Sequence, residues 1–318
     1  MRPFRSLSGF LIALMLVGAA CGGGGGSSHS SQSPGGTSQT PSAAFPVTIA
    51  DDDGVSVTLD AAPKRIITFA PSATEIVYAL GLGEKLVGVS GRYDDYPAAA
   101  KQVQEVGGAG DFGVDPNIET VVSLEPDLLI AIEGGDAWKS RLRELGVPVF
   151  TIDATDLADL IHDIGTVGRL TGATQAADTL AARMAAEDQR IEEAIAGEPR
   201  VSCFFEVYYP PLTTTGPGTF ISDLLDRAGC DSTSASATSD YPEWSVDDLV
   251  RKSPDVYLVS SESGVSPEAV GKRPGFDAIK AVASGNVILI DSDLVSRAGP
   301  RVVEGLHLLA EALHPNAF

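Results

Sequence analysis

The sequence predicts an α/β protein in which two similar lobes are joined by a single long helix. Short apolar segments alternate with amphipathic helical segments along most of the chain, which is the pattern of α/β folds. The succession strand, helix, strand, helix occurs twice. The longest helical pattern, residues 171–200, lies between the two occurrences. Its periodicity alone fits an ordinary long helix packed on one core equally well.

The first 21 residues predict a secretion signal. Arg2 and Arg5 precede the apolar run 10–17, which is too short to span a membrane, and small residues then lead to Cys21. Small residues before a Cys resemble a bacterial lipoprotein signal, in which the Cys receives the lipid and becomes the mature N-terminus. We therefore expect lipidation of Cys21, with ordinary cleavage nearby as the alternative.

Residues 22–46 are a low-complexity segment of Gly, Ser, Thr, Pro and Gln without an apolar pattern. Such a segment cannot bury enough surface to offset its ordering entropy, so we expect a flexible tether with an average span of about 25–30 Å. The net charge of the whole chain is −21, and it becomes −23 when the two Arg residues of the signal are removed. This charge disfavours binding to nucleic acid, whose phosphates it repels.

Residues 47–170 predict the first α/β lobe. Alternating runs around Asp53-Gly54 indicate a β-hairpin over residues 47–59. Ser72 and Glu75 have the spacing of a capping box, and Gly81 is expected to end that helix. The remaining apolar and amphipathic runs predict strands at 65–70, 86–90, 128–132 and 147–152, and helices around Glu119, at 138–145 and at 157–170.

Residues 171–198 predict the linking helix. Thr174 is the expected N-cap, Gly197 the expected left-handed C-cap, and Pro199 prevents the helix from continuing. At 1.5 Å per residue the helix would span roughly 35 Å, about the width of a small domain. Its apolar positions recur on one face: Ala173, Ala177, Leu180, Met184, Ile191 and Ile195.

Residues 199–318 predict the second lobe. When Pro126-Asp127 is superposed on Pro254-Asp255, Glu119 aligns with Asp247, each in the polar face of a short helix. Cys203 and Cys230 would lie in an oxidising compartment, so they either pair across a strand and its neighbour or remain two free buried thiols.

Enzyme and metal chemistry find little support in the sequence. It contains no HExxH, GxSxG or Walker motif, and none of its four His has metal-ligand spacing to another. Residues 108–113 match GxGxxG, but no clear strand precedes them and Asp111 would face a pyrophosphate. We therefore expect no catalytic residues, no resident cofactor and no metal site, and an enzyme of unknown reaction is only the remote alternative.

Aromatic and polar side chains instead gather in the loops that follow strands, where open α/β sheets bind ligands. Aromatic residues on two facing lobes, together with one Arg, suit a large, flat, amphipathic ligand. Each of these residues taken alone also fits a partly buried packing position. The residues concerned are Tyr93, Tyr96 and Trp138 in the first lobe, and Tyr208, Tyr209, Tyr241, Trp244 and Arg297 in the second.

Four segments together resemble the substrate-binding proteins of ABC importers for cobalamin, haem and ferric siderophores. They are residues 65–90, 107–131, 207–230 and 297–315. The resemblance implies two Rossmann-like lobes joined by one long helix, the helical-backbone type of metal receptor. It therefore favours the linking role for residues 171–198, and it implies an extracytoplasmic, membrane-anchored transport receptor.

Within that family the chain is most similar to the cobalamin receptor, so the resemblance implies a corrinoid ligand, with haem or a ferric siderophore as the alternative. It also implies that Glu119 and Asp247 dock onto Arg residues of a permease dimer, although Asp247 is one methylene shorter than the usual Glu. A monomer is expected. The ligand-lining positions that it implies are Tyr93, Gly135, Tyr241, Trp244, Asp293 and Arg297.

Overall fold

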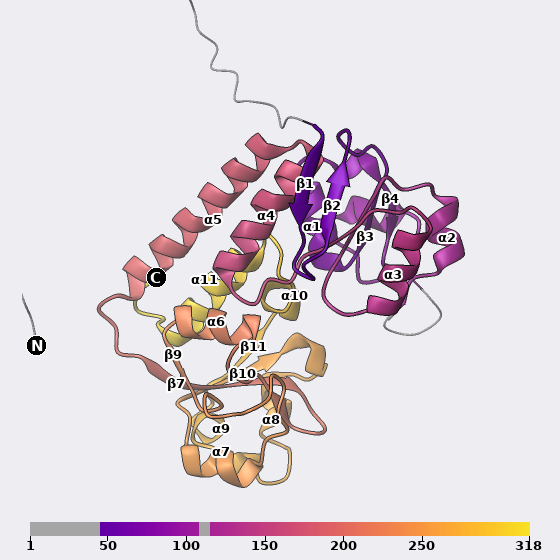
Figure 1. Cartoon of the computed structure of the whole chain (residues 1–318). Helices are drawn as coiled ribbons and strands as arrows, with labels where there is room; N and C mark the ends of the chain where they lie inside the picture. Colours follow the sequence, from indigo (N-terminus) through magenta and orange to yellow (C-terminus); the bar gives the residue numbers. More distant parts are fainter. Residues whose placement is uncertain (1–44, 108–114) are drawn as a thin grey trace, which may run out of the picture. The chain divides into compact units, whose positions relative to one another are not determined.

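A parallel four-stranded sheet forms the centre of the first lobe (Figure 1). The computed structural model describes residues 45–107 and 115–318, so Cys21, most of the tether and the GxGxxG segment lie outside the described residues. The strand order is β4 (Leu86–Val89), β3 (Ile66–Phe69), β5 (Leu128–Ala131) and β6 (Val149–Thr151), and all neighbours are parallel.

The residues of the central strands are all buried, and all but Thr68 are apolar, because both faces of the sheet are covered. Ile66 and Leu128 belong to one hydrophobic cluster, whereas Ile67 and Leu129 belong to another on the opposite face. The antiparallel hairpin of β1 (Val47–Ala50) and β2 (Ser56–Leu59) packs on the first cluster. The helices of this lobe are α1 (Pro71–Ala79), α2 (Ile118–Ser123), α3 (Asp136–Glu144) and α4 (Leu157–Thr171), with short 3-10 turns at Gly83–Lys85 and Ala98–Gln102.

The second lobe repeats this topology, as the sequence predicts. Its strands pair in parallel in the order β9 (Cys230–Ser232), β7 (Val201–Tyr208), β10 (Val256–Ser260) and β11 (Val287–Ile290). In each lobe the first strand is therefore flanked by the second and the third, with the fourth beyond. The short β8 (Thr213–Thr214) pairs antiparallel with the end of β7. The helices are α6 (Phe220–Arg227), α7 (Val246–Lys252), α8 (Pro267–Val270), α9 (Lys280–Ala283), α10 (Ser292–Val295) and α11 (Val302–Leu313), with 3-10 turns at Ser261–Ser263 and Phe276–Ala278.

The repeat extends to an unusual backbone conformation. Within the described ranges, Glu125 and Ser253 are the non-glycine residues with positive φ, at 46° and 56°. Each directly precedes a Pro-Asp pair at the start of the third strand of its lobe. Left-handed backbone is uncommon for such residues, so its recurrence at matching positions supports two copies of one structural unit.

Helix α5 (Thr174–Ile195) leads from the first lobe to the second, packing against α4 and against α11 (Figure 1). Two expected caps of this helix are wrong. The N-cap is Ala173, because Gly172 ends α4 in a left-handed turn (φ 77°) and α5 begins almost at once. At the other end Gly197 is not left-handed, so the helix ends at Ala196 without a glycine cap.

The capping box expected at Ser72 and Glu75 is also wrong. Helix α1 starts two residues earlier, with Ala70 in place of Ser72 at the N-cap, Pro71 as its first residue and no side-chain cap. Both residues therefore lie inside the helix and are buried. Gly81 ends the helix region in the expected left-handed conformation, with φ of 75°.

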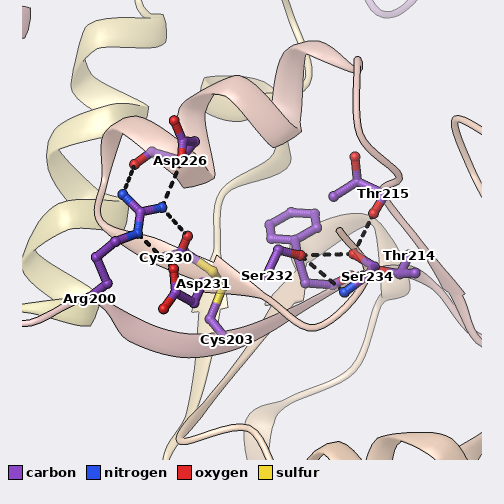
Figure 2. Close-up of a disulfide and its surroundings, with 10 residues drawn as sticks. Arg200, Cys203, Thr214, Thr215, Asp226, Cys230, Asp231, Ser232 and Ser234 are labelled. Carbon is purple, nitrogen blue, oxygen red and sulfur yellow. Dashed lines mark hydrogen bonds and ion pairs between the residues drawn. A yellow bond between two sulfur atoms is a disulfide. The ribbon is translucent and has the colours of Figure 1, made fainter. Parts of the chain in front are cut away.

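Cys203 of β7 and Cys230 of β9 are joined by a disulfide, one of the two states that the sequence left open (Figure 2). Arg200 lies beside it and donates to the carbonyl of Cys230 and to the carboxylates of Asp226 and Asp231, the latter at 2.7 Å. No helix among the described residues is long and apolar enough to cross a membrane.

We expect loss of this disulfide to lower the free energy of unfolding by about 3 kcal/mol, because the bond restricts a loop of 27 residues in the unfolded chain. Urea unfolding of the Cys203→Ala/Cys230→Ala variant measures this. Reductant should destabilise the wild type by a similar amount and leave the variant unchanged. Equal stability of wild type and variant would contradict the expectation.

Candidate functional site

Two Arg residues of the second lobe reach across to the first lobe. Arg301 at the start of α11 donates to both carboxylate oxygens of Glu75 on α1, at 3.0 and 2.6 Å. Arg297 lies 3.0 Å from Asp95 of the first lobe and 2.8 Å from Asp293. The hydrogen bonds from Arg301 to Glu75 raise the pKa of Arg301, so its guanidinium stays charged. We call these five residues the interlobe ion cluster.

Sequence reasoning found Arg297 and Asp293 but missed Glu75 and Arg301. Glu75 is only 3% exposed and sits among the apolar residues of α1. A carboxylate in that position is expensive unless it is paired, so its presence on an otherwise apolar helix face was the available signal. The pairing holds α1 against α11, and it places Asp95 and Asp293, both partly exposed, at the junction of the lobes.

The loop of residues 91–97 follows β4 and presents two of the predicted aromatic residues. Tyr93 is 41% exposed and Tyr96 is 47% exposed. The guanidinium carbon of Arg301 lies 3.9 Å from the centroid of the Tyr96 ring, so this ring also touches the interlobe ion cluster. The structure therefore brings Asp95 and Tyr96 of this loop together with Arg297, which lies about 200 residues later in the chain.

In the second lobe, Tyr208 is the last residue of β7, the loop of residues 209–212 follows it, and a further loop precedes α7. Tyr208 is 50% and Tyr241 54% exposed. Partial burial, then the negative charges of Asp240 and of Glu133 in the first lobe, raise the pKa of Tyr241. Trp244 is only partly exposed, with Lys252 over its ring at 5.5 Å. Tyr241 and Trp244 lie in a loop, as the sequence predicts, whereas Tyr208 is the last residue of β7 and not part of the loop.

Trp138 does not lie in a loop, so that part of the prediction is wrong, and its contact with a ligand stays a prediction. It belongs to α3, is 9% exposed and packs edge-on against Phe69 at 5.2 Å. Gly135 precedes it in a left-handed conformation (φ 71°), and a Cβ atom there would lie 2.0 Å from the indole nitrogen of Trp138. Gly135 is exposed, so a backbone contact to a ligand there remains a proposal.

A hollow of about 580 Å³ is lined by residues of both lobes, but it contains none of the predicted ligand residues. Its charged side chains include Arg200, already paired with Asp226 and Asp231, and two further acids, Asp156 and Asp223. A polar, acidic hollow is a poor match for a large amphipathic ligand. Across the described residues no group of three or more His, Cys, Asp or Glu side chains could hold a metal ion.

Glu119 and Asp247 occupy equivalent positions in their helices. Asn117 caps α2 by accepting from the amide of Thr120, and Ser245 caps α7 by accepting from the amide of Asp248. Each acid is therefore the second residue of its helix, and both are exposed. Each lobe thus presents one carboxylate at the start of a corresponding short helix.

The chain has two α/β lobes, each with a parallel sheet, and one helix joins them. Both lobes carry exposed aromatic residues. This architecture is that of a two-lobed ligand receptor. The chain belongs to the periplasmic binding protein family, which it matches over residues 66–294. It is 38% identical over 284 residues to the uncharacterized ABC transporter substrate-binding lipoprotein YvrC of Bacillus subtilis, covering 86% of this chain and 87% of that protein.

Other relatives bear names that specify ligands. The chain is 31% identical over 290 residues to a cobalamin-binding protein of Halobacterium salinarum, covering 86% of this chain and 75% of that one. The periplasmic vitamin B12 binding protein BtuF of Vibrio cholerae superposes with a TM-score of 0.70 at 25% identity, covering 80% of this chain and 97% of BtuF. Similar solved structures also include a haem-binding protein and a ferric hydroxamate transport protein.

The chain is therefore a substrate-binding protein of an ABC transporter, in a family of transport receptors and not of enzymes. The same family contains vitamin B12, haem and siderophore receptors.

Proposed function

We propose that this protein is an extracytoplasmic, lipid-anchored receptor that captures a corrinoid between its two lobes and delivers it to an ABC importer. The observation that supports it best is the set of exposed aromatic residues on both lobes, of which Tyr96 contacts Arg301 of the interlobe ion cluster. A corrinoid is large and amphipathic, and it carries its own axial base. It needs apolar walls and hydrogen bonds more than a protein ligand for its metal.

The relatives favour the same ligand class, because the cobalamin-binding protein of Halobacterium and the B12-binding BtuF of Vibrio are both similar over most of this chain. The anchor is proposed from Cys21 and the tether, and agrees with a relative named as a lipoprotein. Docking to a permease dimer through Glu119 and Asp247 completes the proposal.

Haem is the alternative with a specific observation in its favour. Haem iron needs an axial His, Cys, Met or Tyr. Of the described His residues, His162 and His307 lie on helices and His314 is buried. Tyr93, however, is exposed, and its hydroxyl accepts a hydrogen bond from Arg92 at 2.8 Å. A haem receptor would be expected to use this hydroxyl.

If the aromatic loops form the ligand site, Tyr208→Ala and Tyr241→Ala should each weaken cyanocobalamin binding about tenfold, because each removes an exposed ring from the proposed contact surface. Isothermal titration measures the dissociation constants. Phe318→Ala is the matched control, since Phe318 is 44% exposed but packs on His307 at the end of the chain. Unchanged affinity in both Tyr variants would exclude these loops as the corrinoid site.

A further inference from the structure

We propose that two buried carboxylates, Asp94 and Glu206, are positioning residues that hold two aromatic loops in the geometry that accepts ligand. The first aromatic loop is residues 91–97, and the second is residues 209–212 with the preceding Tyr208. The inference rests on the proposed function and adds to it two groups that do not themselves reach the ligand. Asp94 is 2% exposed and Glu206 is fully buried. Each lies in or next to an aromatic loop, and each is surrounded by hydrogen-bond donors.

Asp94 lies in the middle of the 91–97 loop, between Tyr93 and Tyr96. Its carboxylate accepts from the hydroxyls of Thr74 and Ser90 and from the amide of Gly91, the last at 2.9 Å. Thr74 belongs to α1 and Ser90 follows β4, so one carboxylate ties the loop to both elements. A turn within the loop adds a bond from the Asp94 amide to the Gly91 carbonyl at 2.9 Å.

Glu206 lies on β7, two residues before Tyr208. Arg273 donates to its two oxygens at 2.6 and 3.0 Å, and the hydroxyls of Tyr257 and Ser263 complete its partners. The same Arg273 guanidinium lies 4.1 Å from the ring centroid of Tyr209. Glu206 therefore orients Arg273, and Arg273 packs against the Tyr209 ring of the second aromatic loop.

This arrangement matters because Tyr93, Tyr96 and Tyr208 are exposed and lie within or next to loops that have no regular secondary structure. A loop that is mobile when free must be ordered when ligand binds, and that ordering lowers affinity. Hydrogen bonds to a charged carboxylate are about twice as strong as neutral ones. Asp94 and Glu206 thus supply the order in advance, one carboxylate for each lobe.

The test labels the protein with 3-fluorotyrosine and records fluorine NMR spectra, since the chain contains only seven Tyr. Single Tyr→Phe changes assign the signals. Asp94→Asn should shift or broaden the signals of Tyr93 and Tyr96 and leave those of Tyr208 and Tyr209 unchanged. Glu206→Gln and Arg273→Lys should do the reverse. In each variant the dissociation constant for cyanocobalamin should rise about tenfold.

Asp51→Asn is the matched control. Asp51 is a buried carboxylate of the first lobe that accepts from the amides of Val55 and Thr151 and pairs with Arg143, away from both loops. Its loss should lower stability without changing the four Tyr signals or the cyanocobalamin affinity. If Asp94→Asn or Glu206→Gln does not fold, Ser90→Ala and Ser263→Ala each remove one donor and should give smaller changes in the same directions.

The inference is overturned if the four Tyr signals keep their wild-type positions and widths in the folded variants, whatever happens to affinity. Failure of the proposed function looks different. In that case the wild-type protein does not bind cyanocobalamin, while the Tyr signals still show whether each carboxylate orders its own loop.

Discussion

Combined reversal of charge at Glu119 and Asp247 should reduce uptake through the cognate importer to background while ligand affinity stays at its wild-type value. Each residue is the second of a short capped helix, and the two helices are equivalent in the two lobes. A receptor with one carboxylate per lobe is complementary to a permease dimer with one basic pocket per subunit. Glu119→Arg and Asp247→Arg alone should each impair uptake about tenfold, because they leave one correct contact and create one repulsive contact.

Reconstituted transporter in vesicles measures uptake, and titration of the same variants measures ligand affinity. Glu192→Arg/Glu311→Arg is the control, since both acids are exposed, lie on α5 and α11, and change the net charge by the same amount. This control should transport normally. Wild-type uptake by the Glu119→Arg/Asp247→Arg variant would exclude docking through these residues.

The unfolding free energy should fall by about 3 kcal/mol as pH rises from 5 to 8, and Asp163→Asn should remove most of this dependence. Asp163 on α4 is 4% exposed, and its Oδ2 has no hydrogen-bond partner among the described residues. Burial, followed by the charges of Asp52, Asp159 and Asp153, raises its pKa to about 8.

The direction in which the unfolding free energy changes with pH follows from proton binding. Between the unfolded pKa near 4 and the folded pKa near 8, the folded state holds a proton that the unfolded chain has lost, so raising the pH favours unfolding. An Asn cannot ionise and can still donate to Asp52. Urea unfolding across this range should therefore give a flatter profile for Asp163→Asn, and greater stability than the wild type at pH 8. The control is Asp178→Asn, an exposed change on α5, which should keep the wild-type pH profile. Parallel profiles for wild type and Asp163→Asn would contradict the raised pKa of Asp163.

Most of the fold could be predicted because its signals are local. The mostly apolar residues of β3 and β5 result from burial on both faces of a parallel sheet, and the repeated Pro-Asp pairs mark the same strand in each lobe. The helix ends were less predictable. The spacing of Ser72 and Glu75 is that of a capping box, but Pro71 already sets the start of α1, and the partner of Glu75 is Arg301, 226 residues away.

At the candidate site, the sequence likewise could not predict which aromatic residues are exposed. Trp138 follows β5 and Tyr208 is the last residue of β7, and nothing local in the sequence separates a core ring from an exposed one. The left-handed backbone at Gly134 and Gly135 accompanies a ring that packs on Phe69, whereas Tyr208 leaves β7 with half of its surface exposed. Thr74 lies 20 residues from Asp94, and the partners of Glu206 lie 51 to 67 residues from it, so these two positions required the structure.

The central claim is that the aromatic loops of the two lobes capture a corrinoid, and titration calorimetry of the wild-type protein with cyanocobalamin, haemin and a ferric hydroxamate siderophore tests it most directly. We expect one cyanocobalamin per chain, recovered chemically unchanged, with a dissociation constant at least about tenfold below those of the other two ligands. Preferred binding of haemin or of the siderophore, or chemical conversion of the corrinoid, would contradict the claim.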